Sequence, residues 1–179
     1  MPRLFAALFS LGCATVVVAG SQPASFDVLI VNGRVLDGSG SPSVRADVGV
    51  RGSRIAGVGA LAGAAAARTI DARGHIVAPG FIDVHSHAAE SLTRQELRQA
   101  QPILAQGVTT IVVNPDGGGP VDLAKQRAEL ERGGTGPNVA LLIGHGSVRS
   151  AVVGEAARAP TDPELTRMQD LVRRGMDDG

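Results

Sequence analysis

Two histidines separated by one residue are the part of this sequence best suited to chemistry. His85 and His87 close the run Phe81–Val84, whose apolar character is typical of a short strand. Side chains two positions apart on a strand lie on the same face, so we expect the two imidazoles to point together. Two neutral imidazole nitrogens close to one another form half of a tetrahedral or five-coordinate metal shell. The pair alone is a weak signal, because two such histidines are also compatible with an ordinary surface.

The segments after this pair alternate between helix and strand patterns. Further strands are predicted at Val108–Val113 and Asn138–Ile143. The predicted helices occupy the stretch up to Gln106 in two pieces divided at Pro102, then residues 121–132, and finally a helix that begins at Thr161 or Asp162. Such alternation predicts βα units and a parallel sheet. Chemistry in these sheets lies at the carboxyl ends of the strands, which is where the histidine pair stands.

Three other polar residues lie near the predicted strands. His145 follows the third parallel strand, a position that favours supporting a metal or orienting a substrate, although a loop histidine is the alternative. Asp83 precedes the histidine pair on its strand and is interpreted as structural. His75 lies before the first βα unit and is interpreted as a surface histidine.

Residues 26–79 have a different pattern and predict a small antiparallel sheet. β-rich runs such as Asp27–Val31 and Asp47–Arg51 alternate with turn signals. Asn32-Gly33 and Gly52-Ser53 are both typical of two-residue hairpin turns. This region contains little chemistry, and with the parallel segments it predicts the α/β class.

The first residues resemble a secretory signal peptide. Arg3 precedes a charge-free run from Leu4 to Gly20, and small residues follow. The run is shorter than the roughly 20 residues that a spanning helix requires. We therefore predict a signal peptide over residues 1–20, a linker over 21–25 and an exported protein, periplasmic or extracellular. Lipid attachment at Cys13 is a less favoured alternative, because Ser10 stands where a lipoprotein signal has Leu.

Composition excludes several functions. The 179 residues contain 17 basic and 17 acidic side chains, which gives no general reason to bind nucleic acid or anionic lipid. With no Trp, no Tyr and 4 Phe, the chain has few aromatic rings on which bases could stack. A single cysteine excludes an intramolecular disulfide and a cysteine-rich zinc site. The hydrophobic content of 44% is that of a folded protein with a core.

Three strings together resemble the amidohydrolase superfamily. They are the decapeptide Ala78–His87, the pentapeptide Gln106–Thr110 and the hexapeptide Gly144–Arg149, the last being similar to the N-acyl-D-amino-acid deacylase branch. The resemblance covers the chain from about Phe26 onward. It implies a small β-domain beside a metal-dependent (β/α)₈ barrel, in which one or two Zn²⁺ ions activate a water that hydrolyses a carbon–nitrogen bond. It also implies a small-molecule amide substrate, an N-acyl-D-amino acid.

The resemblance assigns roles to individual residues. His85 and His87 match the metal ligands of the first barrel strand. Asp116 aligns where these deacylases commonly carry a cysteine that bridges two metals, and a carboxylate can bridge two metals as well; alternatively, Asn-Pro-Asp-Gly is simply a turn. Arg149 is a candidate to bind the substrate carboxylate, with His145 nearby in the sequence. The general base and further histidine ligands are expected on later strands.

The number of βα units predicts an incomplete barrel. A (β/α)₈ barrel needs about 250 residues, whereas residues 80–179 contain three βα units. We therefore expect an N-terminal fragment that is inactive by itself and exposes an apolar sheet edge. Two alternatives stay open: a cyclic amidase of the hydantoinase or dihydroorotase kind, and a non-catalytic protein that retains the fold.

Overall fold

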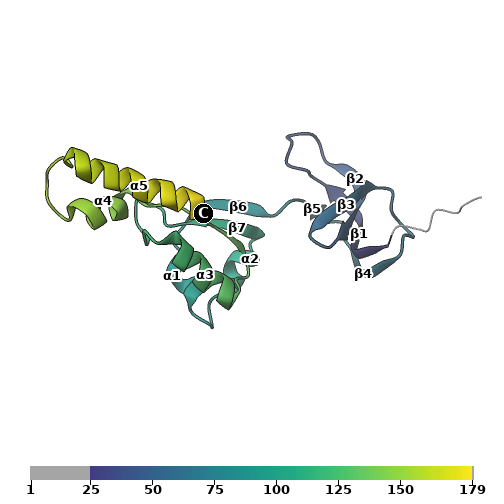
Figure 1. Ribbon diagram of the computed structural model, residues 1–179. Helices are drawn as coiled ribbons and strands as arrows, with labels where there is room; N and C mark the ends of the chain where they lie inside the picture. Colours follow the sequence, from purple (N-terminus) through teal and green to yellow (C-terminus); the bar gives the residue numbers. More distant parts are fainter. Residues whose placement is uncertain (1–24, 179) are drawn as a thin grey trace, which may run out of the picture. The chain divides into compact units, whose positions relative to one another are not determined.

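The computed structural model describes residues 25–178, which form two units that divide after Ala78 (Figure 1). The predicted signal peptide, Cys13 and residues 21–24 of the predicted linker lie outside the described residues. Between residues 25 and 178, none of the helices combines the length and apolar composition that a membrane span requires.

The first unit is a five-stranded sheet. Its strands are β1 (Phe26–Val35), β2 (Val44–Arg51), β3 (Arg54–Gly59), β4 (Ala66–Asp71) and β5 (Ile76–Val77). The order is β3-β2-β1-β4, and β5 also pairs with β1. The predicted antiparallel pairing is confirmed for β1 with β2 and β2 with β3, and the turn at Gly52-Ser53 joins the latter two. β4 and β5 pair with β1 in parallel, which local turn signals do not reveal.

The hairpin predicted at Asn32-Gly33 is wrong. β1 continues through both residues and has a bulge between Ile30 and Gly33. Asn32 has a φ of 64°, its backbone N–H donates to Asp47 Oδ1 (3.0 Å), and its side chain donates to Asp71 Oδ1 (2.9 Å). The last bond is the main reason why the pKa of Asp71 lies below its ordinary value. The left-handed conformation that Asn-Gly favours is therefore used for a bulge instead of a turn.

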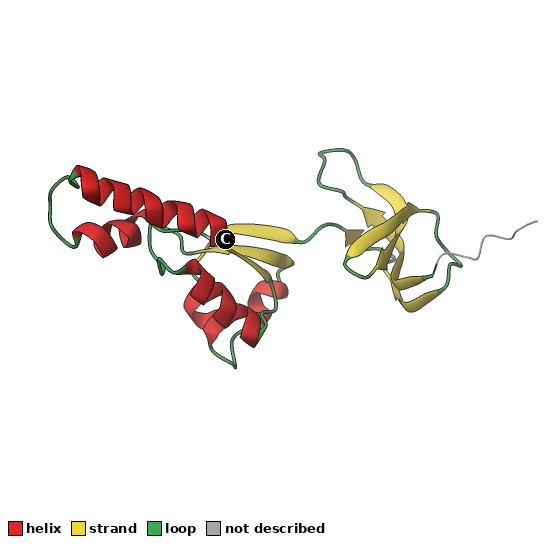
Figure 2. Cartoon of the chain, in the orientation of Figure 1, coloured by secondary structure: helices red, strands yellow, loops and turns green. Residues whose placement is uncertain are grey.

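The second unit contains a parallel sheet with helices, as predicted (Figure 2). Its strands are β6 (Phe81–Ser86), β7 (Val108–Val113) and β8 (Asn138–Leu141), in that order across the sheet. Its helices are α1 (Ala89–Thr93), α2 (Gln101–Leu104), α3 (Leu123–Gly133), α4 (His145–Val153) and α5 (Asp162–Asp178). Pro102 lies in the first turn of α2, where its missing N–H costs nothing. The sequence does not predict helix α4, because the first turn of this helix carries the poor helix former Gly146.

The core of the second unit lies between β7 and the helices that follow β6 and β7. Ile111 and Val113 of β7 are completely buried and pack with Leu92 of α1 and Leu130 of α3. Burying such side chains contributes about 1.5–3 kcal/mol each. The core packing holds β7 against α1 and α3, and the parallel pairing of β6 with β7 places the carboxyl ends of the two strands next to one another.

Candidate metal centre

The two histidines lie at the end of β6 with their rings close together. His85 is the penultimate residue of β6, and His87 follows the strand directly. The ring centroids are 5.3 Å apart and the ring planes are inclined by 55°. Asp83 Oδ1 accepts a hydrogen bond from the His85 backbone N–H (3.1 Å), which agrees with a structural role for Asp83. The period of two along the strand therefore brings both imidazoles to one place.

Asp116 joins this pair from the loop that follows β7. Its Oδ2 lies 3.4 Å from His85 Nε2 and 3.3 Å from His87 Nε2. One potential ligand atom from each of the three residues lies within 4.8 Å of the others, and all three residues are exposed. Among residues 25–178 this is the one group of three or more His, Cys, Asp or Glu side chains placed to hold a metal ion.

The spacing of these three atoms fits a small divalent cation. Zinc binds imidazole nitrogen at about 2.0–2.1 Å and carboxylate oxygen at about 2.0–2.2 Å. Two ligands at such distances from a tetrahedral ion lie about 3.3–3.5 Å from each other, which agrees with the two nitrogen–oxygen separations of 3.4 and 3.3 Å. Two nitrogens and one oxygen also form a donor set of the kind found in catalytic zinc sites, which keep a further position open.

The loop that carries Asp116 is a tight turn as well as part of this group. Asp116 and Gly117 both have positive φ, 59° and 77°, and Gly118 N–H donates to Pro115 O (3.1 Å). Asp is one of the few residues with a side chain that tolerates the left-handed region. The two interpretations of Asp116 are thus compatible: the turn sets the backbone, and the carboxylate faces the histidines.

The Gly-His-Gly string at the start of α4 packs against this loop. A Cβ at Gly144 would collide with the carbonyl oxygens of Gly117 and Gly118, and a Cβ at Gly146 would lie 2.9 Å from Gly117 O. Ser147 N–H donates to the same Gly117 oxygen (3.0 Å). Only glycine permits so close an approach of two backbones. The string therefore helps to shape the loop around Asp116.

The sequence around this metal group matches a known protein family. Residues 68–178 match the model of the amidohydrolase family. The chain belongs to this family.

Characterised amidohydrolases are similar to most of the chain. D-aminoacylase of Alcaligenes xylosoxydans xylosoxydans is 38% identical, over 89% of this chain and 37% of the relative. The crystal structure of N-acyl-D-glutamate deacylase from Bordetella bronchiseptica, complexed with zinc and a phosphonate inhibitor, has a TM-score of 0.78 and 34% identity, covering 86% of this chain and 37% of that one. L-hydantoinase from Arthrobacter aurescens has a TM-score of 0.53 and 22% identity, covering 80% and 37%, and so shares the fold alone. The chain spans about 37% of the length of these relatives.

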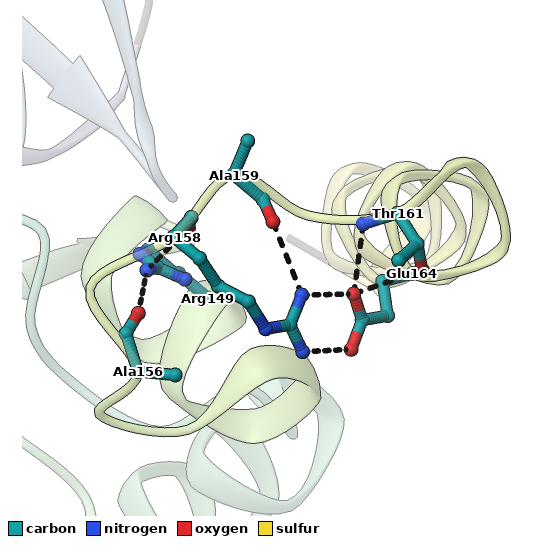
Figure 3. A network of polar contacts seen from close by, with 6 residues as sticks. All are labelled: Arg149, Ala156, Arg158, Ala159, Thr161 and Glu164. Atoms are coloured by element: carbon teal, nitrogen blue, oxygen red, sulfur yellow. Dashed lines mark hydrogen bonds and ion pairs between the residues drawn. The ribbon is translucent and has the colours of Figure 1, made fainter.

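His145 and Arg149 of the present chain lie on α4 and are not part of the metal group. His145 is exposed at the first position of the helix. Arg149 Nη2 donates to the backbone carbonyl oxygens of Ala156 and Arg158, and so holds the loop that follows α4 (Figure 3). A contact of either residue with a substrate stays a prediction.

The same loop is tied to the start of α5. Arg158 makes two hydrogen bonds of 2.7 Å to the Glu164 carboxylate, which also accepts from the backbone N–H (2.8 Å) and hydroxyl (2.9 Å) of Thr161 (Figure 3). These partners hold the pKa of Glu164 well below its usual range, Arg158 having the largest effect. The sequence predicts that the last helix begins at Thr161 or Asp162, and α5 begins at Asp162. The Glu164 carboxylate, by accepting from the Thr161 backbone N–H, supplies one of the two hydrogen bonds of a capping box.

Proposed function

We propose that the protein is a zinc-dependent hydrolase of carbon–nitrogen bonds that deacylates N-acyl-D-amino acids. The observation that carries the proposal is the convergence of His85, His87 and Asp116 at the carboxyl ends of two adjacent parallel strands. The similarity to D-aminoacylase supports the choice of substrate.

The three side chains have distinct tasks in this proposal. His85 and His87 each present a nitrogen, and the carboxylate of Asp116 supplies the negative charge that offsets part of the charge of a cation. Zinc in such a site activates water near neutral pH and polarises an amide carbonyl. Because a carboxylate has two oxygens, Asp116 has the capacity to hold either one ion or two. The exposure of all three residues leaves the group accessible to a small amide.

We further propose that this chain does not turn over the substrate by itself. The reaction needs a base that takes a proton from water and passes it to the leaving amine. Among residues 25–178, the one carboxylate of the metal group is Asp116, which the proposal uses as a metal ligand. The group therefore has no other carboxylate that could act as this base.

Deacylation of N-acyl-D-amino acids is favoured over two alternative functions. A hydantoinase-like cyclic amidase is supported by likeness of fold alone, at 22% identity, whereas the deacylases reach 34–38%. A non-catalytic role gives no physical reason for placing two imidazoles and a carboxylate within 4.8 Å of one another on an exposed surface.

A chimera tests whether this segment supports the metal-dependent deacylation of an intact barrel. Residues 25–178 would replace the matching segment of the Alcaligenes D-aminoacylase, and the chimera would be offered N-acyl-D-amino acids, their L-enantiomers and cyclic amides. We expect zinc-dependent hydrolysis of the D-enantiomers, which is lost on His85→Ala. A chimera that folds and hydrolyses only cyclic amides would instead establish the alternative.

We also propose that the protein is exported through the signal peptide of residues 1–20. The charge-free run from Leu4 to Gly20 and the small residues after it support this proposal.

A further inference from the structure

A pair of buried amides lies directly beneath the loop that carries Asp116. Asn114, the first residue after β7, is 5% exposed, and Gln126 of α3 is 9% exposed. The two side chains exchange hydrogen bonds: Asn114 Nδ2 donates to Gln126 Oε1 (2.9 Å), and Gln126 Nε2 donates to Asn114 Oδ1 (3.1 Å). Asn114 Nδ2 also donates to Leu142 O (3.0 Å), just after β8.

Packing alone does not explain this pair. Gln126 lies on the buried face of α3 together with Leu123 and Leu130, where the helical period calls for an apolar residue. Burying two amides is costly unless both are paired, and replacing both by apolar groups of similar shape can be neutral or stabilising. A buried, reciprocal amide pair instead fixes one arrangement of the segments it joins.

The segment that the pair fixes is the loop from Asn114 to Gly119. Asn114 has a φ of 64°, a left-handed conformation in which a side-chain anchor helps to hold a residue other than glycine. The loop closes over the anchored side chain, because a Cβ at Gly119 would lie 2.6 Å from Asn114 Cβ. On its other side, Gly117 O accepts from Ser147 N–H of α4 (3.0 Å). Asp116 lies between these two attachments.

We infer that Asn114 and Gln126 are positioning residues, which act as a unit to hold the Asp116 carboxylate toward His85 and His87. The inference rests on the proposed metal centre. Outer partners that orient a ligand usually change metal affinity 10–100-fold when they are replaced. The amide pair is such a partner for Asp116, although it acts through the backbone of the loop and not through the carboxylate itself.

The test is a cobalt(II) titration of the chain, followed by visible absorption, with four variants. Gln126→Met keeps the volume of the side chain but removes both hydrogen bonds. Asn114→Gly relieves the left-handed backbone of strain but removes the amide, so it separates backbone conformation from side-chain anchoring. The double variant tests whether the pair acts as a unit. Asn138→Ala is the matched control, because Asn138 donates to Thr109 O (3.1 Å) at the opposite end of the same strands.

We expect Gln126→Met and Asn114→Gly each to weaken cobalt binding at least tenfold, and Asn138→Ala to bind cobalt like the parent. Because the pair acts as a unit, the cobalt affinity of the double variant should be no lower than that of the single variant that binds cobalt less tightly. Circular dichroism with chelator identifies any variant that does not fold, and the remaining single variant then decides. If folded Gln126→Met and Asn114→Gly bind cobalt like a parent that itself binds, the positioning role is wrong while the metal centre stands. A folded parent that binds no cobalt would overturn both.

Discussion

Asp116 Oδ2 lies 3.3 Å from His87 Nε2, although the two residues follow different strands of the sheet. The parallel pairing of β6 with β7 produces this contact, because it places the carboxyl ends of both strands at the same edge. The same oxygen lies almost equally far from His85 Nε2, at 3.4 Å. A single carboxylate oxygen shared between two imidazoles is the arrangement expected of ligands around one cation.

Asp116→Asn separates the role of the charge from the role of the turn. Asn tolerates the left-handed conformation of residue 116 as well as Asp does, so the turn is kept. The negative charge that favours a cation is lost. We expect zinc affinity to fall at least tenfold, as measured by competition with a chelator dye. Thermal unfolding in excess chelator should match that of the parent, and a variant with unchanged zinc affinity would reduce Asp116 to a turn residue.

Gly144→Ala tests the contact between α4 and the Asp116 loop. The added methyl would collide with the carbonyl oxygens of Gly117 and Gly118, so the loop or the helix must move. We expect a loss of about 1–3 kcal/mol in the free energy of unfolding, together with weaker zinc binding. Gly118→Ala is the matched control, since its nearest neighbour would be Pro115 O at 3.6 Å. If urea denaturation gives the two variants the same free energy of unfolding, the approach of Gly144 to the carbonyl oxygens of Gly117 and Gly118 is not as close as described.

The parallel sheet could be predicted from the sequence because β-branched runs such as Val108–Val113 have a strong local signature. The histidine pair could be predicted for the same reason, as a period of two on a strand is local. The Asn114–Gln126 pair could not, because a glutamine at an apolar position of a helix does not indicate its distant partner. The direction in which the Arg149 side chain points depends on the conformation of the loop at residues 154–160, with which it makes hydrogen bonds. The bulge at Asn32 likewise depends on hydrogen bonds to Asp47 and Asp71. Sequence spacing does not encode these tertiary contacts.

The ion pair at the start of α5 predicts a pH dependence of stability. Arg158 and Thr161 lower the pKa of Glu164 in the folded chain, whereas the unfolded chain has the ordinary value near 4.5. The stabilisation is therefore complete above that value and is lost as the pH falls below it. We expect Glu164→Gln to lower the melting temperature at pH 7 and to have a smaller effect near pH 3. An equal decrease at both pH values, measured by circular dichroism, would contradict a role for the carboxylate charge.

Export predicts a shortened N-terminus. Signal peptidases cut after small residues, and Gly20 is followed by Ser21. Protein isolated from the periplasm or medium of its native host should begin between Ser21 and Phe26 by mass spectrometry. Recovery of soluble protein that still begins at Met1 would contradict the proposal, and an acylated N-terminal Cys13 would establish the lipid-anchored alternative.

Zinc titration of the purified chain and its histidine variants tests the central claim most directly. His85→Ala and His87→Ala each remove one nitrogen from the group, whereas His75→Ala removes an exposed histidine of the first unit and serves as the control. The account predicts saturable zinc binding by the parent and by His75→Ala, and at least a tenfold loss of affinity in each of the other two variants. Unchanged affinity in His85→Ala and His87→Ala, with their fold retained, would contradict a metal centre at the end of β6.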